Sequence, residues 1–518
     1  MNYQRAALRD PFARIQARRP RNLYGANSLE IFSGADGLDC SHEDADGFLT
    51  YPTSFPTRAA NFWRKDAGVK VWAYEEKFDN WHDTYGMDAV MVFYHSGHGN
   101  MDRKGVFGTI MGAKWDGRDR AFSTHMAFAN EQLRYLFWST CLSLRVLHRN
   151  TPVRTWWNPN QGGLRMLFGY ETTSVDDPNY GKFFWEEWQK GKPFARAFLD
   201  ASWRISHDQI PAAMAAGSNQ SDAINRLNNE RFFSRMPVEK GWYQWQWIAP
   251  LRAHRLADST LVPRELNSIV LGNKFADDRR IAQIARAASA TRREANTIRV
   301  DANGNRMISS RAFRLNVNNE GALNLYFGKP NVANRNRLVQ RKAIAIARRF
   351  ISHLGLNSRV QLTLGNIRYR FTGGGTLQGS GRLDEPAAIE TIVQFRQCHN
   401  RVESINSDHG LLTVGVDNDG EVVNVYDSTK LVLREVDQRT AASSSPRDPG
   451  RAPHETINGR FKNKIQKIVG TNAKRKTRRE KVGYDFSSSL GIVVHQRQVE
   501  VDFGNNLKKR YKVRIPVM

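Results

Sequence analysis

Two short apolar runs in the first third of the chain each lead into a chemically reactive side chain. Ala89–Tyr94 is followed by a small, glycine-rich turn that contains His98, and Leu133–Trp138 is followed within three residues by Cys141. Continuous apolar runs of this length, bounded by glycine and small polar residues, predict strands that are buried on both faces. We therefore expect His98 and Cys141 at the carboxyl ends of two core strands.

The pattern around these runs predicts alternating strands and helices. Leu29–Phe32 is expected to be the first strand, and a helix over Thr57–Ala67 is expected to lead into a strand over Val69–Tyr74. A third apolar run, Leu164–Tyr170, precedes Asn179–Ser206, whose apolar spacing is typical of helices. This order favours an α/β fold with a mainly parallel sheet flanked by helices.

The second half of the chain predicts a different, α+β region. Helices are expected over Asp277–Arg299 and Ala343–Leu354, a strand over Ile367–Phe371, and a hairpin whose turn is Asp417–Gly420. The predicted organisation has five parts. They are a basic N-terminal arm (residues 1–24), an α/β domain (25–250), a basic connecting region (251–336), a small α+β module (337–440), and a basic linker with C-terminal strands (441–518).

The positive charge of the chain is concentrated in its second half. The net charge of the 518 residues is +26, but residues 1–250 hold 30 Lys and Arg against 27 Asp and Glu, whereas the rest holds 47 against 24. A near-neutral half and a strongly basic half indicate separate roles, and the basic half is suited to an acidic partner, nucleic acid or an anionic membrane surface. A merely solvated basic surface is an equally open interpretation.

Cysteine usage and the absence of long apolar runs predict the compartment. Three cysteines, Cys40, Cys141 and Cys398, are too few for a disulfide framework in a chain of this length. The arginine-rich N-terminus lacks the apolar core of a secretory signal, and no apolar run approaches the roughly 20 residues that span a bilayer. The sequence therefore predicts a soluble, cytoplasmic protein without a transmembrane segment.

A cysteine and a histidine at adjacent strand ends form a candidate nucleophile and base. A free thiol is mostly protonated at neutral pH, and a neighbouring imidazole can generate the reactive thiolate. The backbone N–H groups of Gly99 and Cys141 are candidates for stabilising the oxyanion, since glycine lets a carbonyl approach the main chain closely. The 43 residues between His98 and Cys141 leave room for one crossover to the next parallel strand.

These motifs resemble the caspase, gingipain and legumain group of cysteine peptidases. The resemblance covers roughly residues 25–215 and is strongest to a bacterial and archaeal branch of that fold with little assigned function. The motifs that carry it are Gly97-His98-Gly99, Trp138-Ser139-Thr140-Cys141 and Leu167-Phe168-Gly169-Tyr170. The caspase-type sequence Gln-Ala-Cys-Arg-Gly is absent, which leaves the preferred substrate residue open. Residues 337–435 are similar to small helix-plus-sheet modules that accompany peptidases.

The resemblance implies a cysteine endopeptidase that needs no cofactor. His98 would be the base and Cys141 the nucleophile, and a specific protein would be cleaved through an acyl-enzyme. Glu171, Asp176 and Asp177 would line a pocket for Lys or Arg, although a solvated acidic loop is an equal alternative. Among bacterial relatives of this kind, roles in antiphage defence and in processing gasdermin-like pore formers are known, and the resemblance extends that expectation to this chain.

Two alternatives remain open at the level of the sequence. His95 and His98, with His82 or His125, could suggest a zinc site, but side chains three apart on a strand point to opposite faces. The other alternative is a catalytically silent fold in which Cys141 is an inert core residue and the chain is a basic adaptor for nucleic acid or membrane. Tyr511 and Phe503 would then supply stacking aromatics.

Overall fold

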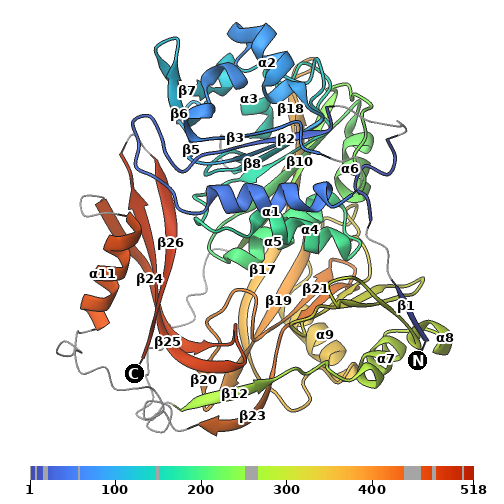
Figure 1. Cartoon of the computed structure of the whole chain (residues 1–518). Coiled ribbons are helices and arrows are strands. Elements are labelled where there is room, and N and C mark those ends of the chain that lie inside the picture. The colour runs from blue at the N-terminus through green and yellow to red at the C-terminus, as the bar shows by residue number, and fades with distance from the viewer. Residues whose placement is uncertain are drawn as a thin grey trace.

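A computed structural model describes most of the chain, and one large sheet runs through both halves of it. The described residues are 2–5, 9–15, 22–55, 59–147, 151–250, 267–436, 457–469, 474–504 and 507–517. The fold is mixed α/β, with this mainly β sheet flanked by helices (Figure 1). Smaller sheets of three and five strands pack beside it.

The first half contributes a parallel set of strands to the large sheet. In spatial order these are β3 (Phe62–Lys65), β2 (Tyr24–Ser28), β4 (Val92–Ser96), β8 (Tyr135–Ser139) and β9 (Met166–Tyr170). Each is buried along its whole length except β3, as expected for strands covered on both faces. The parallel pairing predicted for the two apolar runs is thus present between β4 and β8.

Helices cover one face of these strands. They include α1 (Ser41–Thr53), α4 (Tyr180–Gln189) and α5 (Phe194–Ile205), which lie together on that face (Figure 1). Tyr135 and Phe137 of β8 pack into this helical side, while Leu136 and Trp138 point to the opposite face. The alternation is the period-two pattern of a strand.

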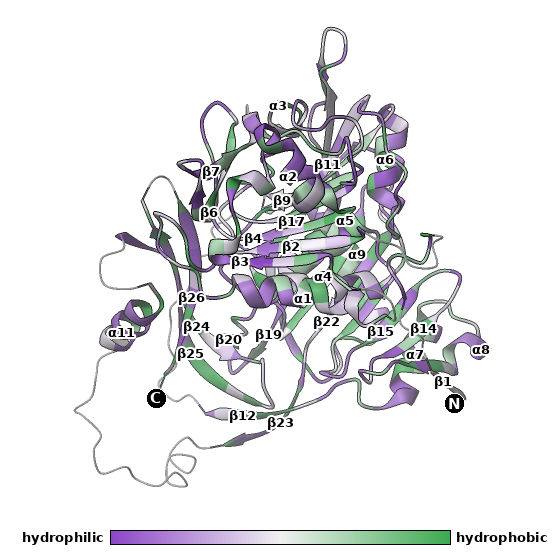
Figure 2. Cartoon of the chain, turned by 45° about the horizontal axis from the view of Figure 1, so that its top comes forward, coloured by the Kyte–Doolittle hydropathy of each residue, from purple (hydrophilic) through white to green (hydrophobic). Residues whose placement is uncertain are grey.

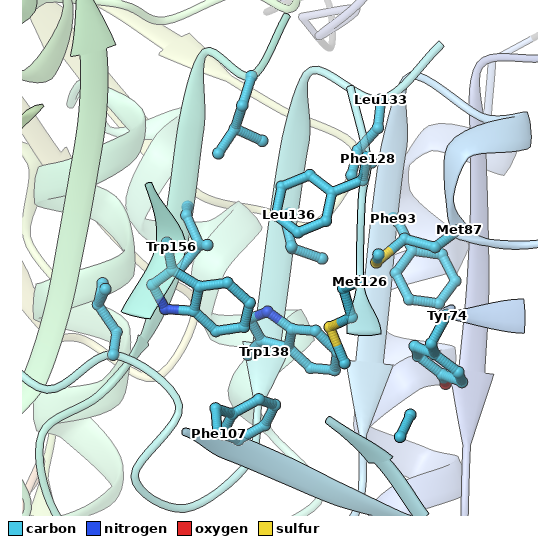
Figure 3. Packing of buried hydrophobic residues seen from close by; sticks show 14 of the residues in the cluster. Tyr74, Met87, Phe93, Phe107, Met126, Phe128, Leu133, Leu136, Trp138 and Trp156 are labelled. Atoms are coloured by element: carbon cyan, nitrogen blue, oxygen red, sulfur yellow. The ribbon is translucent and has the colours of Figure 1, made fainter. Parts of the chain in front are cut away.

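The opposite face is covered by aromatic side chains and a small antiparallel sheet rather than by a crossover helix. Between β4 and β8 the chain forms β5 (Gly99–Met101), β6 (Phe107–Trp115) and β7 (Arg118–Phe122). Figure 3 shows Phe107 and Trp156 packed against Trp138 of β8, with Leu136 and Phe128 further along the same face. The connection between β4 and β8 therefore carries a β insertion in place of the expected crossover helix.

Antiparallel strands carry the sheet from the first half into the second. After β9 the order is β10 (Pro211–Gly217), β11 (Trp242–Pro250), β17 (Gln361–Thr376), β19 (Ala387–His399), β21 (Leu411–Asp417) and β22 (Val422–Asp427). The predicted strand over Ile367–Phe371 and the predicted hairpin are confirmed within β17 and between β21 and β22. Because β11 pairs with β17, the two halves share backbone hydrogen bonds across the predicted boundary at residue 250.

The sheet ends in short strands next to the helices of the second half. Beyond β22 come β16 (Leu323–Tyr326), β15 (Arg314–Val317), β14 (Arg306–Ser309), β13 (Thr297–Val300) and β1 (Asn2–Arg5). Their core is closed by α7 (Asp278–Ala287), α8 (Arg292–Ala295) and α9 (Gln340–His353). The expected helix over Asp277–Arg299 is thus broken in two and followed by a strand, while the helix over Ala343–Leu354 is confirmed.

A separate sheet is formed by the last part of the chain. Its strands are β23 (Leu431–Val436), β12 (Ser268–Gly272), β25 (Leu490–Asp502), β24 (Lys474–Asp485) and β26 (Lys508–Pro516). Figure 1 shows β24 and β26 standing beside the first half, with α11 (Ile457–Val469) on the outside. The remaining short elements are α2 (Asp79–Tyr85), α3 (Pro152–Trp156), α6 (Gln220–Asn229), β18 (Arg382–Leu383) and β20 (Val402–Glu403).

Three of the predicted early elements are wrong. The first strand of the parallel set is β2, which precedes Leu29–Phe32, because the small residues Gly25 and Ala26 fit a closely packed strand: a Cβ on Gly25 would lie 2.7 Å from the Phe62 ring. Thr57–Ala67 holds strand β3 instead of a helix, and Val69–Tyr74 forms a short 3₁₀ turn. The start of the basic linker predicted within residues 441–518 lies outside the described residues.

Hydrophobic residues concentrate on the central elements, whereas outer elements such as α8 are hydrophilic (Figure 2). In the part of the chain that the structure describes, every helix is too short or too polar to cross a bilayer.

Candidate functional site

The ends of β4 and β8 bring His98 and Cys141 to the same edge of the sheet. The register of the two parallel strands pairs Ser96 with Ser139, and each candidate residue follows two positions later. Gly99, which directly follows His98, allows the two segments to pack closely against each other. A Cβ on Gly99 would lie 2.7 Å from Thr140 Oγ1 and 3.0 Å from the carbonyl oxygen of Cys141, so a larger residue would push them apart.

The His98 ring is held by its Nε2 atom and by two aromatic rings. Nε2 lies 3.2 Å from the carbonyl oxygen of Asp36, which can only accept a hydrogen bond. This contact selects the tautomer with the proton on Nε2 and leaves Nδ1 as the proton acceptor. The rings of Phe32 and Phe503 lie 4.7 Å and 5.0 Å from the imidazole.

Burial keeps His98 neutral. The side chain is 1% exposed, and this burial, together with the positive charge of Lys509, lowers the pKa of His98 to about 3. Thr109 Oγ1 donates a hydrogen bond of 2.7 Å to the His98 carbonyl, which fixes the main chain at this point. The imidazole is therefore unprotonated and oriented, but a pKa so far below neutral makes it a weak base while the site is covered.

The thiol of Cys141 is surrounded by main-chain and hydroxyl groups. Its Sγ lies 3.1 Å from the carbonyl oxygen of Lys508, to which it donates, and accepts a hydrogen bond of 3.3 Å from the backbone N–H of Ser174. Ser174 Oγ is 3.4 Å away. Cys141 is 1% exposed. The carbonyl of Lys508, on a strand far away in the sequence, occupies the space in front of the sulfur.

The cover over both residues comes from the hairpin that joins β25 to β26. Phe503 packs on His98, Lys508 presents its carbonyl to Cys141, and the backbone N–H of Arg510 donates 3.2 Å to the carbonyl of Ser174. The backbone N–H of Asp176 donates 3.0 Å to the carbonyl of Arg510, so β26 is hydrogen-bonded alongside residues 174–176. We call residues 503–504 and 507–510 the covering segment.

Lys509 inserts its side chain among the predicted acidic residues. Its Nζ donates 3.2 Å to Ser174 Oγ, and the residue is 3% exposed. Burial raises the pKa of Asp176 to about 6, while the charge of Lys509 acts in the opposite direction. Asp176 Oδ2 also accepts a hydrogen bond of 3.0 Å from the backbone of Asp39. A basic side chain thus occupies the neighbourhood of Asp176.

The other two predicted pocket residues have structural partners. Glu171 accepts hydrogen bonds from Arg145 and from the backbone of Val146 and Leu147, so both of its oxygens hold the loop after Cys141. Asp177 accepts from the backbone and side chain of Asn179 at the start of α4. Of the three predicted acidic pocket residues, Asp176 is therefore the one that we include in the proposed pocket.

The histidines of the alternative zinc site do not gather. Among the described residues, no group of three or more His, Cys, Asp or Glu side chains is arranged to hold a metal ion. His95 is instead bonded through Nδ1 to Tyr74 Oη at 2.7 Å and through Nε2 to Thr109 Oγ1 at 3.2 Å.

Sequence reasoning missed the covering segment and the contacts it makes. Only the alternating polar and apolar residues of β26 mark it as a strand, and nothing in the sequence indicates its docking site some 367 residues upstream. The aromatics proposed for stacking on nucleic acid are also engaged otherwise. Tyr511 is 7% exposed and Phe503 lies against His98, so neither presents a free ring. The cluster Lys474–Arg479 lies on β24 and is largely exposed.

Comparison with known proteins gives a family match without an assigned activity. No curated protein matches the chain. Residues 25–247 match the model of a family described as a domain of unknown function, DUF6345. The match includes β3, β4, β8 and β9, all but the first residue of β2, and both His98 and Cys141, and it ends before the sheet that covers them.

Proposed function

We propose that the chain is a cysteine endopeptidase of the caspase-like type, with Cys141 as nucleophile and His98 as base. The observation that carries this proposal is the parallel register of β4 and β8, which brings His98 and Cys141 to the same edge of the sheet. The carbonyl of Lys508, 3.1 Å from Cys141 Sγ, accepts a hydrogen bond from the thiol and occupies the position that a substrate would need. The parallel strands and the antiparallel β10 at their edge support a caspase-like sheet, with the dyad at its carboxyl edge.

The proposed reaction passes through an acyl-enzyme. His98 Nδ1 takes the thiol proton as the sulfur of Cys141 attacks the carbonyl carbon, and the tetrahedral oxyanion is stabilised by the backbone N–H groups of Gly99 and Cys141. The C–N bond then breaks, and the imidazolium returns the proton to the leaving amine. Water, deprotonated by the same imidazole, hydrolyses the thioester and regenerates the thiol.

The proposed substrate is a protein with a basic residue near the cleaved bond. The buried Lys509 beside Ser174 and Asp176 supports this choice, because it shows a lysine side chain accommodated next to the nucleophile. A gasdermin-like protein in bacterial defence stays a prediction of the resemblance, as does location in the cytoplasm.

The near-complete burial of Cys141 and His98 favours a second candidate, a catalytically silent fold. On that interpretation the hydrogen bonds of the thiol are those of a core cysteine, and the basic second half acts as an adaptor for an acidic partner, nucleic acid or an anionic membrane. The two candidates differ in whether Cys141 reacts in a manner that depends on His98.

The deciding experiment is covalent labelling with a peptidyl acyloxymethyl ketone that carries lysine next to the reactive carbon. The full chain and a variant with a loosened covering segment, Lys509→Ala, would be incubated with the probe and the adduct located by mass spectrometry. We expect an adduct on Cys141 that is lost in Cys141→Ala and in His98→Ala.

Cys40→Ala is the matched control, since burial and nearby acidic residues raise the pKa of the half-buried Cys40 thiol and make it unreactive. It should leave labelling unchanged. Labelling that persists in His98→Ala, or no labelling of folded Lys509→Ala, would favour the silent fold. In that case, DNA or anionic vesicles should still be retained by Cys141→Ala in a salt-dependent manner.

A further inference from the structure

A small cavity lined by cationic side chains lies where three parts of the chain meet. The end of α5 contributes His207 and Asp208, strands β17 and β19 contribute arginines, and the C-terminal sheet contributes the remaining cations. The lining cations are Arg368, Arg396, Arg479, Lys481 and Lys512. None of these residues belongs to the candidate peptidase site.

Cations outnumber carboxylates among the described lining residues of this cavity. Asp208 is the one carboxylate among them, and Arg479 Nη1 binds its Oδ1 at 3.0 Å. Arg396 also donates to the neutral carbonyls of Ser404 and Asn406, at 2.6 Å and 3.3 Å. Lys512 donates to the carbonyl of Ile205 and to Ser407 Oγ, and Asp177, Asp208 and Asp408 attract its charge.

The crowding of positive charge affects the protonation of the groups in the cavity. Burial, followed by repulsion from Arg514, lowers the pKa of Lys512 to about 8. Burial and the charges of Arg368 and Arg396 likewise lower the pKa of His207. An anion placed here would relieve this repulsion.

Three residues that line the same cavity carry buried polar atoms without partners. Within the described residues, Arg368 Nε, His207 Nε2 and Gln498 Nε2 have no hydrogen-bond partner. The three residues are 4%, 7% and 5% exposed, so water does not freely satisfy these atoms. Unpaired buried polar groups are costly, and three of them on the lining residues of one cationic cavity indicate a missing ligand.

We propose that this cavity binds a phosphate group, either as inorganic phosphate or as the monoester phosphate of a small metabolite. A phosphate dianion offers several acceptor oxygens, which match the convergent guanidinium and ammonium donors. The small size of the cavity suits one phosphate group. Because its lining comes from α5, from the central strands and from the C-terminal sheet, the bound group would fasten these parts together.

The test is thermal unfolding of the full chain in a phosphate-free buffer. Sodium phosphate and glycerol 3-phosphate would be titrated separately against sodium chloride of equal ionic strength. We expect a saturable rise in Tm of roughly 1–2 °C at ten times the Kd, with no such rise in chloride. A rise with both compounds indicates recognition of the phosphate group itself, and a rise with one alone identifies the free ion or the monoester.

Variants separate specific binding from general charge effects. Arg368→Gln and Lys481→Gln should weaken phosphate binding about 10- to 100-fold, as measured by ³¹P NMR line broadening or calorimetry. Lys476→Gln, an exposed cation on β24 outside the cavity, is the matched control and should bind as the wild type does. Lys481 is only half-buried, so its variant remains informative if Arg368→Gln does not fold.

The proposal is overturned if neither phosphate compound raises Tm above the chloride curve. It is also overturned if Lys481→Gln and Lys476→Gln bind phosphate with the same affinity as the wild type. Neither result depends on peptidase activity.

Discussion

At the scale of single residues, buried neutral histidines make the fold sensitive to acid. Burial, followed by the charge of Lys509, lowers the pKa of His95 to about 3, as it does for His98. An unfolded histidine has a pKa of about 6.5, so between about pH 6.5 and pH 3 the unfolded chain binds more protons than the folded chain. The free energy of unfolding therefore falls as the pH is lowered through this window.

We predict that each of these histidines contributes about 2 kcal/mol to the loss of stability between pH 7 and pH 5. Urea unfolding at several pH values measures the effect. His95→Gln lowers stability at pH 7 but should reduce the slope of stability against pH, because one titrating group is removed. An unchanged slope in a folded His95→Gln protein would show that His95 is protonated within the native state.

A second residue-scale prediction concerns the acidic side of the site. If Asp176 selects a basic side chain, Asp176→Asn should reduce the labelling of Cys141 by a lysine-containing probe about 10-fold or more. A probe with a neutral residue in place of the lysine should label Cys141 as it does in the wild type. Asp177→Asn is the matched control, since Asn can retain the turn at the start of α4. Equal loss with both probes would mean that Asp176 supports the fold of residues 174–176 rather than substrate choice.

At the scale of secondary-structure elements, α5 is fastened to the second half of the chain by a buried ionic cluster. Arg196 of α5 donates 2.8 Å to Glu390 of β19, and Arg370 of β17 binds the same carboxylate. Both arginines and the glutamate are almost fully buried. Removing the shared carboxylate leaves the buried Arg370 without its carboxylate partner and leaves Arg196 with Asp200, at 2.7 Å.

We therefore predict that Glu390→Gln lowers the free energy of unfolding by about 3–5 kcal/mol. Chemical denaturation measures this change. Glu186→Gln is the control, since Glu186 is half-exposed and Arg204 keeps Glu187 at 3.3 Å, so the substitution should cost less than about 1 kcal/mol. A loss at Glu390 no greater than the loss at Glu186 would show that water reaches the cluster and that it does not fasten the two halves.

The elements also show which features the sequence can predict. β4, β8 and β9 were predictable because continuous apolar runs report strands buried on both faces, and their common direction placed His98 and Cys141 at one edge. The helix predicted over Thr57–Ala67 was wrong because Phe62 is required as the strand residue that packs on Gly25, a tertiary contact that local propensity does not encode. Local patterns likewise contain no information about which strand covers Cys141.

At the scale of the whole molecule, the C-terminal sheet determines whether the candidate site is open. The covering segment contacts the dyad through the Phe503 ring, the Lys508 carbonyl and the Lys509 side chain. The same strand, β26, reaches Lys512 in the cationic cavity. Displacement of this one sheet would expose both Cys141 and His98 without disturbing the parallel strands that position them.

Weakening the cover should consequently make the thiol accessible without unfolding the protein. Phe503→Ala removes a half-buried ring from its contact with His98, and a loss of about 1.4 kcal/mol in docking energy raises the open population about tenfold. We expect a matching increase in the rate at which iodoacetamide alkylates Cys141 under native conditions, measured by mass spectrometry. Leu490→Ala, an exposed residue of β25 away from the dyad, should leave the rate unchanged. If Phe503→Ala reacts no faster than the wild type although it is less stable globally, Cys141 opens only when the chain unfolds. The C-terminal sheet is then a permanent part of the core, and an endopeptidase site at this position is untenable.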